Sequence, residues 1–183
     1  MLRVATLAVL VAVGTGACSG GQATPAANGS SPTQPAGCAA TAAPRAAPSL
    51  DVCLSGALSG MLTTVDPETT QCTGDQSGFD GTFVALLDSV ETRWEILTPH
   101  AAGTFDVNAP STDLTLNVVQ AAKQKTWSSV AEAGRSGTVT LVADRSGVVD
   151  VTLPERDQRT GAEVAGAPTL TVRGTFRCPA TGA

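Results

Sequence analysis

Apolar and polar residues alternate along most of the chain beyond residue 49, a pattern that predicts β-strands with one buried face. Between Val52 and Leu62 every even-numbered position is apolar or glycine, so this stretch predicts one half-buried strand. A Leu-Ser-Gly repeat within it also places leucines four residues apart, as on a helix. The two interior glycines favour the strand, because each costs about 1 kcal/mol in a helix.

Eight further segments predict strands, and they span residues 82–87, 93–97, 104–107, 114–118, 126–130, 138–143, 148–153 and 169–178. Segment 120–133 is also compatible with a helix, and we favour the strand within it. Turns are expected at 66–68 and at 144–147, where Gly147 is expected to have a positive φ. A charged loop is expected over 154–168.

Short strands separated by Gly- and Pro-rich turns are typical of an antiparallel β-sandwich. The expected fold is therefore all-β, an immunoglobulin-like sandwich of about seven to nine strands over residues 49–179.

The first 17 residues have the three parts of an export signal. Arg3 is the only charge before Cys18, a weakly polar or apolar run extends from Val4 to Val13, and small residues precede the cysteine. The run is shorter than the roughly 20 residues that span a bilayer, and no later segment is long and apolar enough to do so. We expect residues 1–17 to be a signal peptide that is removed.

Residues 15–18, Thr-Gly-Ala-Cys, resemble the lipobox of bacterial lipoproteins. In that family the cysteine thiol receives a diacylglyceryl group, and a peptidase then cuts just before it. The resemblance implies that Cys18 carries fatty acyl chains such as palmitate, which hold the chain at the extracytoplasmic face of the cell membrane. The alternative is an ordinary secretory signal that leaves Cys18 as a thiol.

Residues 18–48 are predicted to be the lipidated cysteine and a disordered tether. From Ser19 to Pro48 there is no Leu, Ile, Val, Met or aromatic residue. Such a segment cannot bury enough apolar surface to offset the entropy lost on ordering. A flexible chain of this length has a root-mean-square reach of roughly 30 Å.

Four cysteines remain if Cys18 is lipidated: Cys38, Cys53, Cys72 and Cys178. An even number in an exported chain predicts two disulfides, although four cysteines allow three connectivities. Cys178 follows Phe176 on the inward face of the last strand, and Cys72 comes just after the first turn. We favour a Cys72–Cys178 bond, which leaves Cys38 to pair with Cys53.

No motif predicts catalysis, a metal or a cofactor. His100, the only histidine, lies between two predicted strands, and a solvated loop residue is favoured over a catalytic base. No C-x-x-C pair is present, and segment 75–81 is interpreted as a Gly-rich connection rather than a calcium loop. Trp94 and Trp127 are expected in the core.

The net charge and the composition limit the classes of partner that this protein is expected to bind. The net charge is -5 with only two lysines, which argues against nucleic-acid binding. Residues 155–159, Glu-Arg-Asp-Gln-Arg, form the most charged segment. We expect a solvated loop there with local ion pairs of little energetic value, and it is the first place to look for a partner contact.

The lipobox, the Thr/Pro/Gly tether, the small β domain and a final strand ending in Gly-Thr-Phe-Arg-Cys (174–178) together resemble small actinobacterial cell-envelope lipoproteins, including the mycobacterial lipoprotein antigens. The resemblance implies a non-enzymatic, lipid-anchored protein whose sandwich binds or supports an envelope protein. One alternative is a carrier that holds an apolar ligand such as a lipid between its sheets. A second alternative is an envelope hydrolase that uses His100.

Intact mass spectrometry tests the lipidated cysteine. Protein extracted from membranes is expected to have the mass of a chain that begins at Cys18, with two or three acyl chains and two disulfides. Cys18→Ser is expected to release the protein from the membrane. Wild-type protein that is found in the medium with an unmodified thiol at this position would contradict the expectation.

Overall fold

The computed structural model describes residues 48–63, 65–66, 68–75, 78–109, 113–130, 133–143 and 145–178. Backbone contacts divide the chain into Met1–Thr33 and Gln34–Ala183, and every described residue belongs to the second unit. The predicted signal peptide, Cys18, Cys38 and the tether up to residue 47 lie outside the described residues.

The described residues form two six-stranded antiparallel sheets. Sheet A consists, in spatial order, of β2 (Gly60–Leu62), β1 (Ser49–Gly56), β12 (Leu170–Arg177), β10 (Ser146–Leu153), β9 (Ser136–Val142) and β6 (Gly103–Asp106). Sheet B consists of β11 (Glu155–Asp157), β8 (Lys125–Ser128), β7 (Thr115–Gln120), β5 (Val90–Thr98), β4 (Gly78–Leu87) and β3 (Gln71–Asp75). A single 3-10 turn, η1 (Ala121–Lys123), precedes β8.

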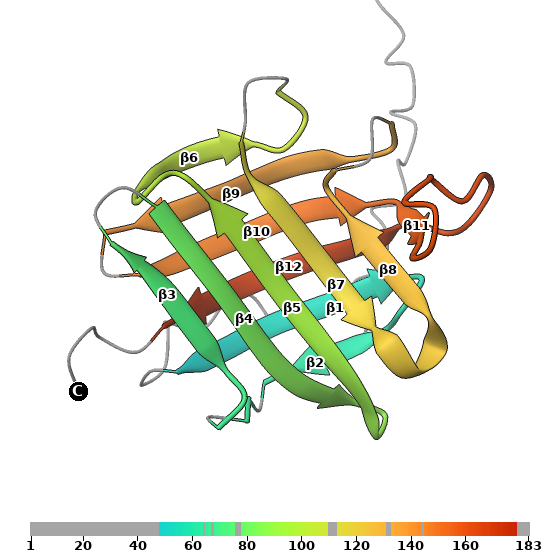
Figure 1. Ribbon diagram of the computed structural model, residues 1–183, viewed down its shortest axis with the longest axis horizontal. Helices are drawn as coiled ribbons and strands as arrows, with labels where there is room; N and C mark the ends of the chain where they lie inside the picture. Colours follow the sequence, from blue (N-terminus) through green and yellow to red (C-terminus); the bar gives the residue numbers. More distant parts are fainter. Residues whose placement is uncertain are drawn as a thin grey trace, which may run out of the picture. The chain divides into compact units, whose positions relative to one another are not determined.

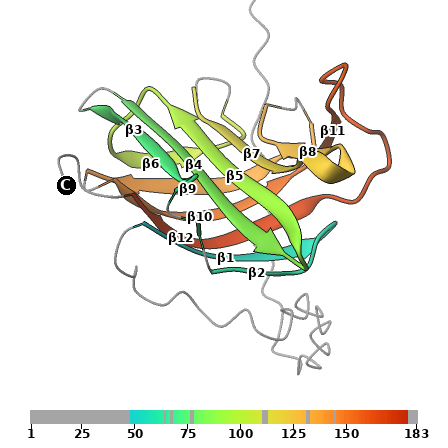
Figure 2. The same cartoon turned by 60° about the horizontal axis from the view of Figure 1, so that its bottom comes forward.

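The two sheets pack face to face, so the predicted antiparallel β-sandwich is confirmed (Figure 2). The strands of sheet B cross those of sheet A at a steep angle, which is the crossed form of sheet packing rather than the nearly aligned form (Figure 1). The structure has more strands than the seven to nine expected, because short edge strands such as β2 and β11 contain too few residues to show an alternating pattern.

Most predicted strands are confirmed, and their apolar positions fill the space between the sheets. An aromatic cluster occupies the centre, where Phe176 of sheet A meets three rings of sheet B. Its ring centroid lies 4.8 Å from that of Trp94 and 5.9 Å from those of Phe79 and Phe83. Trp127 is also fully buried, so both tryptophans are core residues as predicted.

The single strand predicted over 52–62 is wrong. The chain forms a hairpin in which Val52 of β1 pairs with Leu62 of β2. Gly56 and Gly60 flank the turn with φ of 98° and 148°, a backbone region that favours glycine. The even-numbered glycines that looked like strand positions therefore mark the start and the end of the turn.

The prediction of a positive φ at Gly147 is also wrong. Arg145 has the left-handed conformation in this turn, with a φ of 65°. Gly147 instead lacks room for a side chain, because a Cβ there would lie 2.5 Å from the Phe176 ring and 2.6 Å from the Thr140 carbonyl oxygen. This glycine allows Phe176 to reach the aromatic cluster.

Segment 120–133 and the expected loop over 154–168 each contain a short strand. Within 120–133 the favoured strand is confirmed as β8, and helical structure is limited to η1. The expected charged loop over 154–168 contains β11, which extends sheet B by pairing with β8. The turn predicted at 66–68 is present, because the N–H of Glu68 donates to Oδ1 of Asp66 over 2.9 Å.

The predicted Cys72–Cys178 disulfide is confirmed and joins the two sheets. Cys72 lies on the edge strand β3, whereas Cys178 follows β12, and their Cα atoms are 5.8 Å apart. Arg145 bridges the same two residues. Its Nη2 donates to the Cys72 carbonyl oxygen over 2.6 Å, and its own carbonyl oxygen accepts from the N–H of Cys178 over 2.9 Å.

Removing this disulfide as Cys72→Ala/Cys178→Ala is expected to lower the free energy of unfolding by about 3–5 kcal/mol. The bond closes a loop with a sequence separation of 106, which strongly restricts the unfolded chain. Guanidinium denaturation of both proteins measures the difference. A loss below about 1 kcal/mol would show that the bond does not hold the sheets together.

Candidate functional site

Two grooves lie on the outer face of sheet B. The first, here called the β8 groove, has a volume of about 480 Å³ and is lined by Asn117, Val119, Ala121, Thr126, Ser128, Val130, Arg156, Asp157, Gln158 and Gly161. The second, the β4 groove, has a volume of about 460 Å³ and is lined by Glu68, Thr69, Gln71, Thr82, Val84, Glu91, Arg93 and Glu95. Both volumes lie in the range of small-molecule sites.

Strand alternation explains why these side chains face outward. On β7, Leu116 and Val118 are fully buried between the sheets, so Asn117 and Val119 point to the opposite face. On β8 the buried Trp127 places Thr126 and Ser128 outward in the same way. The cross-strand partner of Thr126 is Arg156, which lies on the same outer face.

A tight turn after β11 closes one side of the β8 groove. Oδ1 of Asp157 accepts from the backbone N–H groups of Thr160 and Arg159 over 2.8 and 2.9 Å, and from the Thr160 hydroxyl over 3.0 Å. These bonds, led by the Thr160 N–H, lower the pKa of Asp157 below its usual range. The carboxylate contributes to the turn while it is ionised, and this contribution is lost as the pH falls through the lowered pKa. Gly161 completes the turn with a φ of 70°.

The turn fixes the direction of Arg156. Its Nε donates to the carbonyl oxygen of Gly161 over 2.6 Å. In the part of the chain that the structure describes, the two Nη nitrogens make no hydrogen bond and no ion pair with protein. The guanidinium is thus held by one edge, and its other donors remain available on the groove wall.

Polar groups of neighbouring strands complete the wall. Nε2 of Gln158 donates to the Thr126 hydroxyl over 3.0 Å and to the Lys125 carbonyl oxygen over 3.2 Å, which ties the turn to β8. Nδ2 of Asn117 donates to Glu95 over 3.2 Å, and its Oδ1 has no partner among the described residues. The groove therefore offers both donors and acceptors beside exposed aliphatic surface at Val130.

The β4 groove differs in charge. Arg93 lies between Glu91 and Glu95, with nitrogen–oxygen distances of 3.6 and 3.8 Å. Glu68 adds a third carboxylate to the lining. The guanidinium here is already shared by two carboxylates, and these half-exposed ion pairs contribute little to stability.

Three residues of segment 155–159 line the β8 groove, and the expected ion pairs within the segment are wrong. Among the described residues, no ion pair joins two members of the segment. Glu155 instead pairs with Lys125 of β8 at 3.0 Å, and Asp157 accepts the bonds of its own turn. The geometry of this segment therefore depends on its partners across the sheet, such as Lys125, which cannot be read from the linear sequence.

His100 does not line either groove. Its ring stacks on Phe105 at a centroid distance of 4.8 Å, and its backbone N–H donates to the Thr98 hydroxyl over 3.2 Å. In the described ranges no carboxylate forms an ion pair with this ring. The ring is therefore placed as a packing surface for the edge strand β6.

No cluster of three or more His, Cys, Asp and Glu side chains suited to a metal exists within the described residues. In segment 75–81, Asp75 ends β3 and pairs with Gly78, and residues 78–81 belong to β4. No described helix has the length and the apolar character needed to cross a bilayer.

The outer face of sheet A carries Cys53. This residue lies on β1 between the fully buried Val52 and Leu54, so its side chain points away from the core. Cys53 is disulfide-bonded, and Cys72 and Cys178 are bonded to each other. The partner predicted for it, Cys38, lies outside the described residues.

The rest of this face carries polar side chains together with two half-exposed valines, Val142 and Val148. Thr104 and Thr140 share a hydrogen bond of 3.0 Å across β6 and β9, and Arg173 donates to Asp150 over 2.8 Å across β12 and β10. These four polar side chains thus bond to one another across neighbouring strands.

Comparisons of the chain with protein-family models, with curated proteins and with solved structures found no match.

Disulfide mapping decides which cysteine bonds to Cys53, and we expect it to be Cys38. Cleavage before Asp51 and Asp66 separates Cys53 from Cys72, and tandem mass spectrometry then locates the linked cysteine. A Cys18–Cys53 bond would contradict both the expected pairing and the expected lipidation, because a lipidated thiol cannot form a disulfide.

Proposed function

We propose that this protein is a lipid-anchored, extracytoplasmic envelope protein that acts by binding rather than by catalysis, with the outer face of sheet B as its binding surface. The observation that carries the proposal is the different use of the two outer faces. Sheet A carries the disulfide-bonded Cys53 on its outer face, whereas the two described grooves lie on sheet B.

The proposed orientation follows from the anchor. If Cys18 holds the lipid and Cys38 bonds to Cys53, the connection to the membrane reaches the folded domain on sheet A. Sheet B then faces away from the lipid, and its grooves are accessible to envelope components.

A carrier of an apolar ligand is the alternative, and it needs space between the sheets. Both grooves open on the outer face of sheet B, and their linings mix polar and charged groups with aliphatic ones. The space between the sheets is occupied by fully buried side chains such as Trp94, Phe83 and Leu116. These observations favour surface binding over a carrier.

A hydrolase is the third possibility, and it would need a base held by an acid within a cleft. His100 stacks on Phe105 outside both grooves. This position favours surface binding over a hydrolase that uses His100.

Photo-crosslinking in whole cells tests the proposed binding face. A photoreactive residue at Thr82, in the β4 groove, is expected to give defined adducts with envelope components. The matched control places it at Thr138, on the outer face of sheet A, where we expect no such adducts. Adducts from Thr138 but not from Thr82 would reject the assignment of the face.

Native mass spectrometry separates the carrier alternative from surface binding. After mild extraction we expect the mass of the acylated chain alone. A stoichiometric co-purified lipid in addition to the acyl chains would overturn surface binding in favour of the carrier.

A further inference from the structure

We propose that the β8 groove binds a small monocarboxylate that carries a short apolar body and an amide, with Arg156 as the group that holds the carboxylate. The inference rests on the proposed role of sheet B as a binding surface and names the ligand class of one of its grooves.

The guanidinium of Arg156 is oriented but not neutralised. Its Nε is bound to the Gly161 carbonyl oxygen, Nη2 lies beside Gly161, and neither Nη nitrogen makes a hydrogen bond or ion pair with the described protein. Arg93 in the β4 groove shows the contrasting case, because Glu91 and Glu95 already flank it. Of these two groove arginines, Arg156 is the one that can accept an external anion.

A planar fork of N–H donors matches a carboxylate, which can accept two parallel hydrogen bonds from it. The turn that holds Arg156 is itself fixed by three bonds to Oδ1 of Asp157 and by the left-handed Gly161. The donors are therefore positioned before a ligand arrives, which reduces the entropy lost on binding.

Asp157 restricts the charge of the ligand. Its carboxylate lines the same groove and does not pair with Arg156. A dianion such as phosphate would gain both more attraction to Arg156 and more repulsion from this carboxylate than a monoanion would, so its second charge gives little net advantage. Because the planar fork of Arg156 matches a planar carboxylate, we expect the groove to prefer a carboxylate over inorganic phosphate.

The other residues that line the groove indicate which groups the rest of the ligand carries. Val119, Ala121 and Val130 provide aliphatic surface, and Val130 is 48% exposed. Oδ1 of Asn117 is an acceptor without a described partner, suited to an amide N–H. The groove, at about 480 Å³, is open to solvent and larger than such a ligand.

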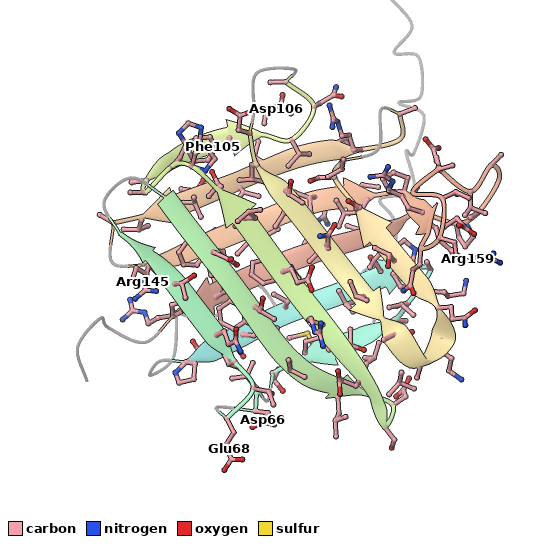
Figure 3. All side chains as sticks on the ribbon, in the orientation of Figure 1. Asp66, Glu68, Phe105, Asp106, Arg145 and Arg159 are labelled. Atoms are coloured by element: carbon pink, nitrogen blue, oxygen red, sulfur yellow. A yellow bond between two sulfur atoms is a disulfide. The ribbon has the colours of Figure 1, made fainter. Side chains whose placement is uncertain are left out.

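Figure 3 shows Arg159 beside β11, which provides a control close to Arg156. Arg159 is exposed and does not line the groove. Arg156→Gln and Arg159→Gln remove the same charge three residues apart, so they separate a specific contact from the general electrostatic field.

The test is an NMR titration of the ¹⁵N-labelled protein, purified in detergent as cells make it, with N-acetyl-alanine. Saturable shifts are expected at the amides of Thr126 and Ser128 and at the Asn117 side chain. Arg156→Gln should weaken binding at least about tenfold, and Arg159→Gln should leave it unchanged. Arg156→Lys, which keeps the charge but loses the fork, should also weaken it.

Two further probes make the result decisive. The neutral methyl amide of N-acetyl-alanine should not bind, and inorganic phosphate should bind more weakly than the carboxylate. The proposal is overturned by the absence of saturable shifts, by equal binding of the methyl amide or phosphate, or by undiminished binding to both Arg156 variants. Such a failure alongside Thr82 crosslinks would reject the ligand class and leave the binding face intact.

Discussion

The contact between Phe176 of sheet A and the aromatic rings of sheet B is the interaction on which the rest of the sandwich depends. Phe176 reaches Trp94 because Gly147 leaves no Cβ in its path, and the Cys72–Cys178 bond joins the sheets two residues farther along the chain. Arg145 connects the same corner through one bond to each cysteine residue (Figure 3). The inner faces are thus occupied by packing, and both described grooves lie on the outer face of sheet B.

The outer faces of the two sheets have different chemistry. On sheet A, threonines and one arginine–aspartate pair bond across neighbouring strands, and Cys53 is committed to a disulfide. On sheet B, the turn after β11 builds a wall whose guanidinium has available donors. Among the described residues, the two outer faces therefore differ in the polar groups that they leave available.

Much of the fold was predictable, because half-buried strands alternate with a period of two and a core cysteine needs a core partner. The β1–β2 hairpin was missed since Gly56 and Gly60 fit the alternation while their φ values produce a turn. The β8 groove was not predictable, because it depends on the pairing of Arg156 with Thr126 across 30 residues of sequence. The only sequence signal was the Asp-x-x-Thr-Gly pattern at 157–161, which is typical of a tight turn.

The central claim is that sheet A faces the membrane and sheet B faces away from it. NMR of the acylated protein in lipid nanodiscs that contain a paramagnetic lipid tests this claim most directly. We expect stronger relaxation at amides of β9 and β12 in sheet A than at amides of β4 and β5 in sheet B. Equal relaxation of both sheets, or stronger relaxation of sheet B, would contradict the account.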